Sequence, residues 1–384
     1  MTVVAPLKPT VHIGLMSGTS LDGVDGVLAR FSPAGDAIEA TLAAAYVPFP
    51  EPLREELMAL QAAAPNEIER EALAANALAM HYADCVRQLL LRAQLDAAEV
   101  GLVGVHGQTV RHRPELGFTR QTNNPALLAE LCGIDVVADF RSRDIAAGGQ
   151  GAPLVPAFHR AIFGSPIQGR VVVNIGGIAN ISILPAGADD GTSMSGTFGF
   201  DTGPGNVLMD AWIKHHHGRH YDANGDWAAS GQVHPALLRC LHDEPFFRLA
   251  PPKSSGRDLF HLDWLAAALA RTGEAITAVD IQATLTALTA ESIAQAITAH
   301  APHTGQVYVC GGGAENGLLM TLLEQALGNR ISVQSTAVLG VAPNQVEALA
   351  FAWLARRFEL RLPGNLPAVT GARGPRVLGA LYPA

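Results

Sequence analysis

The sequence has few charged residues, and lysine is the scarcest of them. Charged residues make up 16% of the 384 residues, and lysine occurs only at Lys8, Lys214 and Lys253. With 26 basic against 35 acidic residues, the formal net charge is -9. Because nucleic acids and anionic membranes attract clusters of basic side chains, this composition argues against both as partners.

Cysteine is also rare, and no hydrophobic run is long. The four cysteines are widely spaced and form no C-x-x-C pair, so we expect neither a disulfide framework nor a zinc site, and we expect a cytoplasmic protein. No apolar stretch reaches the roughly 20 residues that span a bilayer. Residues 1–10 contain two prolines and no apolar run typical of a signal peptide.

Several common catalytic motifs are absent from the sequence. There is no G-x-x-x-x-G-K-[ST], no G-x-G-x-x-G after a strand, no H-E-x-x-H and no G-x-S-x-G, which argues against a P-loop enzyme, a Rossmann dehydrogenase, a zinc protease and an α/β-hydrolase. Apolar residues make up 48% of the chain. Its length suits two domains.

A glycine-rich loop, Gly14–Gly26, lies between two apolar segments that we expect to form a hairpin, Val11–Leu15 and Val24–Phe31. Glycines let N–H groups surround an anion. Carboxylates would repel a phosphate unless Mg2+ lay between them, so Asp22 and Asp25 are candidate metal ligands. The alternative is an ordinary turn between two strands. The candidate phosphate-binding residues are Gly18, Thr19, Ser20, Leu21, Asp22, Gly23, Val24 and Asp25.

The same pattern returns about 160 residues later. Two further strands, Val171–Ile175 and Ile178–Leu184, flank the Gly176–Gly177 turn. Two phosphate-binding hairpins would indicate a duplicated architecture, whereas the alternative is two unrelated hairpins. A third group of glycines, Gly311, Gly312 and Gly313, lies between a strand and a helix, where a phosphate or a flat ring can approach the backbone.

Asp201 is the candidate general base. It lies in the sequence GFDTGPGN (199–206), where a short strand meets a glycine and proline turn before a helix. An aspartate at a strand end is well placed to accept a proton, although the helix dipole lowers its basicity. The alternative is that Asp201 only forms the turn.

Two arginines and three other polar residues are candidates for binding a substrate. Arg141 and Arg143 stand beside a glycine-rich turn, and the planar guanidinium suits a carboxylate or a phosphate; an interdomain salt-bridge cluster is the alternative. Gln108 and Thr109 follow a buried strand. Glu347 opens an otherwise apolar helix, where a buried carboxylate needs a partner.

Three further features have open interpretations. His106 follows the buried strand that ends at residue 105, and we favour an ordinary turn histidine there. Lys253 and Arg257 lie in a polar loop that could meet phosphate or be solvated. Residues 188–196 are polar and glycine-rich, and we interpret them as a surface loop.

Taken together, the motifs resemble the anhydro-N-acetylmuramic acid kinase family, which has an actin-like fold. The resemblance covers nearly the whole chain, and GTSLDGVD and GFDTGPGN are specific in combination. The matching stretches are GLMSGTSLDGVD (14–25), GVHGQTVRH (104–112), QTNNPALLAE (121–130), DFRSRDIAAGGQGAPLVPAFH (139–159), VVNIGGIANIS (172–182), GFDTGPGNVLMDAW (199–212), VYVCGGGAENGLL (307–319), VEALAFAWLA (346–355) and TGARGPRVLGALYP (370–383).

This resemblance implies an α/β protein with a two-lobed actin-like ATPase (ribonuclease H-like) fold. Duplicated mixed sheets would be flanked by helices, with the active site in the interdomain cleft. The expected lobes are residues 1–138 with 360–384, which carry the first phosphate hairpin, and residues 139–359, which carry the second hairpin, Asp201 and an adenosine loop at residues 311–313.

The resemblance also implies a reaction. ATP with Mg2+ would phosphorylate O6 of 1,6-anhydro-N-acetylmuramic acid while water opens the anhydro bridge, a step in cell-wall recycling. Asp201 would activate the water, and the family suggests a homodimer. A non-catalytic ATP-binding sensor and a kinase of another small sugar are the alternatives. The implied substrate-binding residues are Gln108, Thr109, Arg141, Arg143 and Glu347, and the implied ATP-binding glycines of the second half are Gly176, Gly177, Gly311, Gly312 and Gly313.

Overall fold

The computed structural model describes all residues except 1–9, 19–20, 36, 188–195 and 257. Thr19, Ser20, Arg257 and nearly all of the predicted surface loop at 188–196 therefore lie outside the described residues. The chain divides into two compact units, which are residues 1–162 with 345–384 and residues 163–344.

Unit 1 is built on a mixed sheet of six strands in the order β13-β7-β4-β1-β2-β3. The β1, β2 and β3 strands form an antiparallel meander, and β4 and β7 run parallel to β1. A separate antiparallel pair, β5 and β6, was not predicted from the sequence. The strands are β1 (Val11–Met16), β2 (Gly23–Phe31), β3 (Ile38–Pro48), β4 (Leu102–Val105), β5 (Gln108–Arg113), β6 (Phe118–Thr122), β7 (Val136–Ala138) and β13 (Ala380–Tyr382).

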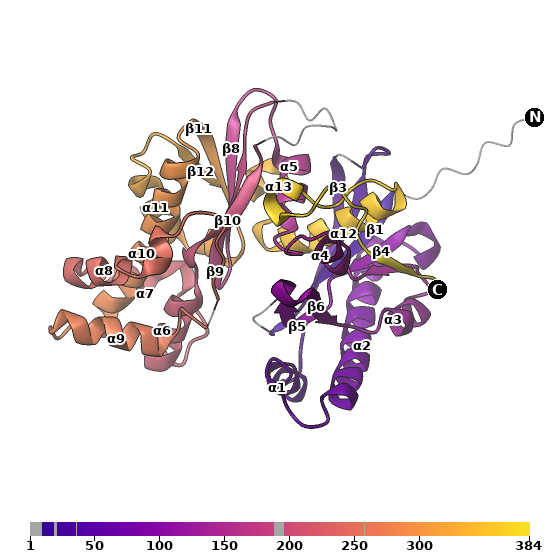
Figure 1. The fold of residues 1–384 in the computed structure, drawn as a ribbon, viewed down its shortest axis with the longest axis horizontal. Coiled ribbons are helices and arrows are strands. Elements are labelled where there is room, and N and C mark those ends of the chain that lie inside the picture. Colours follow the sequence, from indigo (N-terminus) through magenta and orange to yellow (C-terminus); the bar gives the residue numbers. More distant parts are fainter. Residues whose placement is uncertain (1–9, 19–20, 36, 188–195, 257) are drawn as a thin grey trace, which may run out of the picture. The chain divides into compact units, whose positions relative to one another are not determined.

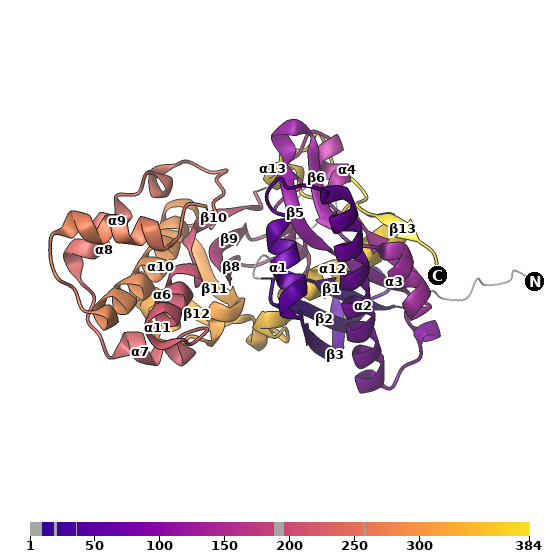
Figure 2. The same cartoon turned by 90° about the horizontal axis from the view of Figure 1, so that it is seen from below.

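Two long helices cover the sheet of unit 1 (Figure 2). The α2 helix packs on β2 and β3, while α12 packs on β1, β2 and β4. A Cβ built on Gly26 points toward Cys85 of α2, and one built on Gly14 of the neighbouring strand points toward α12, so the two helices lie on opposite faces. The helices are α1 (Glu51–Ala59), α2 (Glu67–Ala93), α3 (Pro125–Cys132), α4 (Ser142–Ala146), α5 (Val155–Phe163), α12 (Val346–Glu359) and α13 (Pro367–Thr370).

Unit 2 repeats this topology with a sheet of five strands in the order β10-β9-β8-β11-β12 (Figure 1). Here too an antiparallel meander, β8 to β10, is followed by two strands parallel to the first, β11 and β12. The elements are β8 (Gly169–Ile175), β9 (Ile178–Leu184), β10 (Phe198–Pro204), β11 (Thr304–Cys310), β12 (Ser332–Ser335), α6 (Val207–His217), α7 (Asp226–Ala229), α8 (Pro235–His242), α9 (Leu262–Thr272), α10 (Ala278–His300) and α11 (Gly317–Ala326).

The predicted α/β class with duplicated mixed sheets and flanking helices is confirmed. In each unit the first three strands form the meander, the fourth and fifth join the first in parallel, and the first strand is central. Each unit has its own buried core of aliphatic side chains. The two glycine hairpins of the sequence are the β1–β2 and β8–β9 connections, which occupy the same place in each sheet.

The observed units divide the chain at different points from the expected lobes. Residues 139–162 belong with unit 1 because Asp144 accepts hydrogen bonds from Asn365 and Thr370, and because the Gln150 N–H donates to the Thr370 carbonyl. The α12 helix belongs there because its buried face lies on the sheet of unit 1. Among the described residues, none of the helices combines the length and apolarity needed to cross a membrane.

Candidate functional site

In unit 1, the described part of the β1–β2 loop is fixed by a buried polar network. The Ser17 hydroxyl donates to the Gly107 carbonyl at 3.2 Å and shares a 2.8 Å hydrogen bond with the hydroxyl of Tyr82. Gln108 is fully buried, and its Nε2 donates to the Gly18 carbonyl at 3.0 Å. The loop that follows β1 is therefore held by the segment that follows β4, as expected for neighbouring parallel strands whose carboxyl ends meet at one edge.

Two carboxylates, Asp22 and Glu347, act on a third, Asp25, beside this loop. The pKa of Asp25, on β2, is raised to about 7 by burial and by the negative charges of Asp22 and Glu347. Asp22 is exposed, and Glu347 is half-buried in the first turn of α12. A divalent cation would offset this repulsion, and hard oxygen ligands suit Mg2+. The described residues contain no group of three or more His, Cys, Asp or Glu side chains that could hold a metal ion.

The structure separates the two candidate arginines. Arg141 Nε donates to His106 Nε2 at 3.0 Å, and its NH1 donates to the Gly151 carbonyl at 2.7 Å. Burial lowers the pKa of Arg141 to about 10, while the negative charges of Glu347 and Asp144 act in the opposite direction. By contrast, Arg143 is exposed on α4. Only Arg141 therefore joins the group that includes Glu347.

His106 has a role that the sequence interpretation missed. Its ring is buried, and its pKa is held well below the ordinary value by burial and by the charge of Arg141. A neutral imidazole that accepts at Nε2 carries its proton on Nδ1. His106 is thus a neutral acceptor that orients the guanidinium of Arg141. Its position beside Gln108 in the sequence was the only available signal. The predicted substrate-binding residue Thr109 lies on β5, where its hydroxyl accepts a hydrogen bond from Gln121 of the neighbouring strand β6 at 3.1 Å.

In unit 2, the Gly176–Gly177 turn packs against the start of α6. The Asn206 N–H donates to the Gly176 carbonyl at 2.8 Å, and the Gly205 N–H donates to the Gly177 carbonyl at 2.9 Å. A Cβ on Gly205 would lie 2.3 Å from the Gly176 carbonyl oxygen. Gly205 of the GFDTGPGN sequence therefore allows a close approach between two backbone segments.

The three glycines after β11 have different roles. Gly311 has a φ of 79°, and a Cβ there would lie 2.5 Å from Asn174 Oδ1. A Cβ on Gly313 would lie 2.4 Å from the side chain of Ile175, so both glycines let this turn pack on β8. Gly312 is exposed, and a Cβ there would make only an ordinary van der Waals contact, with Asn206 Nδ2 at 3.7 Å.

Gly312 lines a cavity of about 300 Å³ within unit 2. The cavity has polar and apolar walls from the start of α6, from the loop after α6 and from the turn after β11. Asn316 Oδ1 caps α11 by accepting from the Leu319 N–H, and Asn224 Oδ1 accepts from the Gly317 N–H, so the walls are fixed. The lining residues are Asn206, Met209, Asp210, Tyr221, Asp222, Asn224, Gly312, Glu315 and Asn316.

Asp201 lies on β10 at a β-bulge, half-buried. Its Oδ2 accepts hydrogen bonds from the Ser254 hydroxyl at 3.0 Å and from the Ser255 N–H at 2.9 Å. Burial raises the pKa of Asp201, and the two serine donors and Lys253 counter this effect. Asp201 is therefore a carboxylate placed by the tertiary structure, and its contacts go beyond those of a simple turn former.

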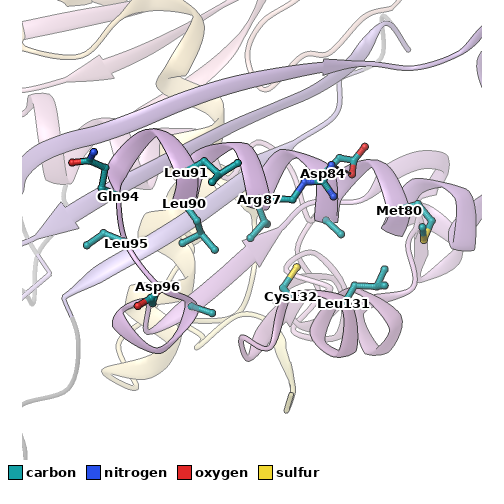
Figure 3. A pocket seen from close by; sticks show the side chains of 13 residues that line it. Met80, Asp84, Arg87, Leu90, Leu91, Gln94, Leu95, Asp96, Leu131 and Cys132 are labelled. Carbon is teal, nitrogen blue, oxygen red and sulfur yellow. Dashed lines mark ion pairs between the residues drawn. The ribbon is translucent and has the colours of Figure 1, made fainter.

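A second cavity, of about 630 Å³, lies in unit 1 between α2 and the end of α3 (Figure 3). It is lined by apolar side chains such as Leu90 and Leu131, and an Asp84–Arg87 ion pair lies at its rim. None of the candidate residues from the sequence lines this groove.

The family model for anhydro-N-acetylmuramic acid kinase matches residues 10–384. Among curated relatives, the anhydro-N-acetylmuramic acid kinase of Cupriavidus pinatubonensis is 59% identical over 97% of this chain and 98% of the relative. The kinase of the same name from Burkholderia cenocepacia is 58% identical over 97% of this chain and 96% of its own length.

Two solved structures show a more distant likeness. The activator of 2-hydroxyisocaproyl-CoA dehydratase from Clostridium difficile, with bound ADPNP, has a TM-score of 0.48 and 12% identity over 90% of this chain and 94% of its own. A ROK family glucokinase from Streptomyces griseus, in complex with glucose and AMPPNP, has a TM-score of 0.40 and 13% identity over 90% of this chain and 99% of its own.

Proposed function

The chain belongs to the anhydro-N-acetylmuramic acid kinase family, and from this membership we propose that it phosphorylates 1,6-anhydro-N-acetylmuramic acid with ATP while water opens the anhydro bridge. The product is N-acetylmuramic acid 6-phosphate, which places the reaction in the recycling of cell-wall sugars. The observation that carries the proposal in the structure is the half-buried carboxylate of Asp201. The Ser254 hydroxyl and the Ser255 N–H both donate to the same oxygen of this carboxylate, Oδ2.

The chemistry needs a base for water and an environment for phosphoryl transfer. Asp201 accepts a proton from water as the water oxygen bonds to the anomeric carbon and the bond from that carbon to O6 breaks. O6 then bonds to the γ-phosphorus of ATP, and ADP leaves. Phosphoryl transfer depends mainly on positioning and charge neutralisation. The other residues of the site therefore have mainly to bind and orient ATP and the sugar.

In unit 1, the loop after β1 is the proposed phosphate contact, and Asp22 and Asp25 are the proposed Mg2+ ligands. When bound, Mg2+ neutralises negative charge on the phosphates. The raised pKa of Asp25 supports this assignment, because it reflects the negative charges of Asp22 and Glu347, and a bound cation would offset their repulsion. Glu347 and Arg141 are the proposed sugar contacts, and the guanidinium suits the lactyl carboxylate.

In unit 2, the cavity beside Gly312 is the proposed site for the nucleoside of ATP. A volume of about 300 Å³ is at the lower end of the range for small-ligand pockets. Amide side chains such as Asn224 and Asn316 are fixed at its walls by hydrogen bonds to α11. A homodimer and a cytoplasmic location also remain proposals, carried by the family resemblance and by the composition.

The direct test of the function is incubation of the protein with ATP, Mg2+ and the anhydro sugar. We expect one ADP for each sugar phosphorylated, with a product that has gained one water and one phosphoryl group by mass spectrometry. Phosphorylation of only a different small sugar would reassign the substrate. ATP binding without any phosphorylated sugar would favour a nucleotide sensor.

Replacing Arg141 by lysine (Arg141→Lys) should raise the KM for the sugar about 10-fold to 100-fold, with a smaller change in kcat. Lysine keeps the charge but loses the planar fork and the donor to His106. Steady-state kinetics at saturating ATP measure this change. The matched control is Arg143→Lys, which alters an exposed arginine of the same segment. A larger effect at residue 143 than at residue 141 would overturn the assignment.

Replacing Gly312 by valine (Gly312→Val) should weaken nucleotide binding about 10-fold to 100-fold while leaving the fold intact. A Cβ has space at this position, but the added methyl groups enter the cavity. Calorimetric titration with a non-hydrolysable ATP analogue measures the affinity. Gly305→Val is the control, because a Cβ on that exposed strand glycine would lie 3.5 Å from its nearest neighbour. Unchanged affinity in Gly312→Val would place the nucleoside elsewhere.

A further inference from the structure

One short segment of unit 2, residues 252–256, holds Asp201 through three hydrogen bonds in addition to the pairing of β10 with β9. The Asp201 N–H donates to the Lys253 carbonyl at 3.2 Å. The next two residues then turn their donors onto the Asp201 carboxylate, the Ser254 hydroxyl at 3.0 Å and the Ser255 N–H at 2.9 Å. Main chain and side chain of the aspartate are thus held by three consecutive residues.

The side chain of Lys253 anchors this segment to the body of unit 2. Its Nζ donates to the Phe246 carbonyl at 3.0 Å and to the Phe247 carbonyl at 3.3 Å. The same ammonium lies 4.6 Å from the ring centroid of Phe246, within the range of a cation–π contact. The ammonium of Lys253 therefore binds two backbone carbonyl groups and an aromatic ring. These contacts do not support the interpretation of Lys253 as a phosphate-binding residue.

The two oxygens of the Asp201 carboxylate differ in their hydrogen bonds. Both serine donors reach Oδ2, and no bond to Oδ1 is found among the described residues, which lack residue 257. A carboxylate held by one oxygen has a fixed plane and presents the other oxygen to a ligand. Oδ1 is then the atom that can accept a proton from water.

The same contacts favour the ionised form of Asp201. Burial raises the pKa of this carboxyl, whereas the Ser255 N–H, the Ser254 hydroxyl and the charge of Lys253 lower it. Among the described residues, Lys253 is the charged group that acts on Asp201 in this balance. A general base must be deprotonated before it can work, so donors on Oδ2 extend its working range toward lower pH.

We propose that residues 252–256 form a clamp for the general base, in which Ser254 fixes the Asp201 carboxylate and Lys253 anchors the clamp. Both are positioning residues for the water-activating step. The clamp rests on the proposed function, because its purpose depends on Asp201 acting as the base. The hydrogen bonds that define it do not depend on the identity of the sugar.

The test of the clamp is a pair of substitutions at one position. Ser254→Ala should lower kcat about 10-fold, leave the KM values for ATP and sugar within about twofold, and move the acid limb of the pH profile of kcat upward by about one pH unit. Ser254→Thr keeps the hydroxyl and should restore most of the rate and the original acid limb. Ser332→Ala is the control, since Ser332 is exposed on β12.

A second substitution tests the anchor. Lys253→Met keeps the length of the side chain but removes the charge and the hydrogen bonds, and it should change kcat and the acid limb in the same direction as Ser254→Ala. Lys214→Met, on the exposed end of α6, is its matched control. Circular dichroism checks the fold of each variant. If Lys253→Met does not fold, the serine pair still decides the proposal.

The results of these experiments distinguish a failure of the proposed clamp from a failure of the proposed function. The pKa of the Asp201 carboxyl, followed by carbon NMR without substrates, should rise in Ser254→Ala whether or not the protein phosphorylates the sugar. An unchanged NMR titration together with wild-type kinetics in Ser254→Ala would refute the clamp and leave the kinase intact. A protein that shows the NMR shift but phosphorylates no sugar would refute the proposed function while keeping the contacts.

Discussion

Replacing Asp201 by asparagine (Asp201→Asn) should lower kcat for sugar phosphorylation about 1000-fold or more, while the Kd for ATP stays within about twofold of wild type. Asparagine has nearly the same shape and retains an oxygen for the Ser255 N–H, which lies 2.9 Å from Oδ2 in the structure. An amide cannot accept a proton from water, so the loss falls on the chemical step. Coupled ADP-release kinetics and calorimetric ATP titration measure the two quantities.

Asp263→Asn is the matched control for this substitution. Asp263 lies exposed in the first turn of α9, in the same unit, and its replacement should leave kcat and ATP affinity unchanged. If Asp201→Asn retains more than about a tenth of the wild-type kcat, another group activates the water. If it loses ATP affinity to a similar extent as kcat, Asp201 acts in binding and its assignment as the base is wrong.

Replacing Gly14 by alanine (Gly14→Ala) should lower the free energy of unfolding of unit 1 by about 3 kcal/mol or more. A Cβ at this position would lie 1.8 Å from the Ala348 carbonyl oxygen and 2.5 Å from the Ala352 nitrogen. Both are backbone atoms of α12, so relief requires the helix to move away from β1. Urea unfolding followed by circular dichroism and by tryptophan fluorescence measures the loss, because Trp353 lies buried in α12.

The expected loss of stability in Gly14→Ala is opposite to the usual effect of replacing glycine by alanine. Alanine in place of a strand glycine usually stabilises a protein by about 0.5–1 kcal/mol, because it reduces the freedom of the unfolded chain. Gly169→Ala, on β8, is the control, because its Cβ would lie 3.7 Å from the nearest atom. Equal stability changes in the two variants would show that α12 does not approach β1 as closely as the structure has it.

The glycines illustrate what a sequence can and cannot tell about a site. The pattern of a strand, a glycine loop and a strand located both hairpins, and their equivalent places in the two sheets confirm the predicted duplication. Yet Gly14 allows close packing on the backbone of α12 and Gly313 allows close packing on the side chain of Ile175, whereas Gly312 lines a cavity. All are equally glycine in the sequence, and only their neighbours in space distinguish them.

The contacts of the candidate residues likewise could not be predicted from the sequence. Arg141 and Arg143 lie two residues apart and were equivalent candidates, but only Arg141 donates to His106. Lys253 was a candidate for phosphate, yet its ammonium bonds to the carbonyl groups of a neighbouring turn. Each distinction depends on which distant segment packs against the residue.

Sequence alone determined the α/β class, the strands that flank the glycine loops, and, through motifs in a fixed order, the family. These features follow from local patterns, because hydrophobic periodicity and glycine turns act over a few residues. Tertiary structure alone decided where the compact units divide, which arginine joins Glu347, and how residues 252–256 hold Asp201. The physical reason is that hydrogen bonds and burial between segments tens to hundreds of residues apart set these properties, and no local pattern records them.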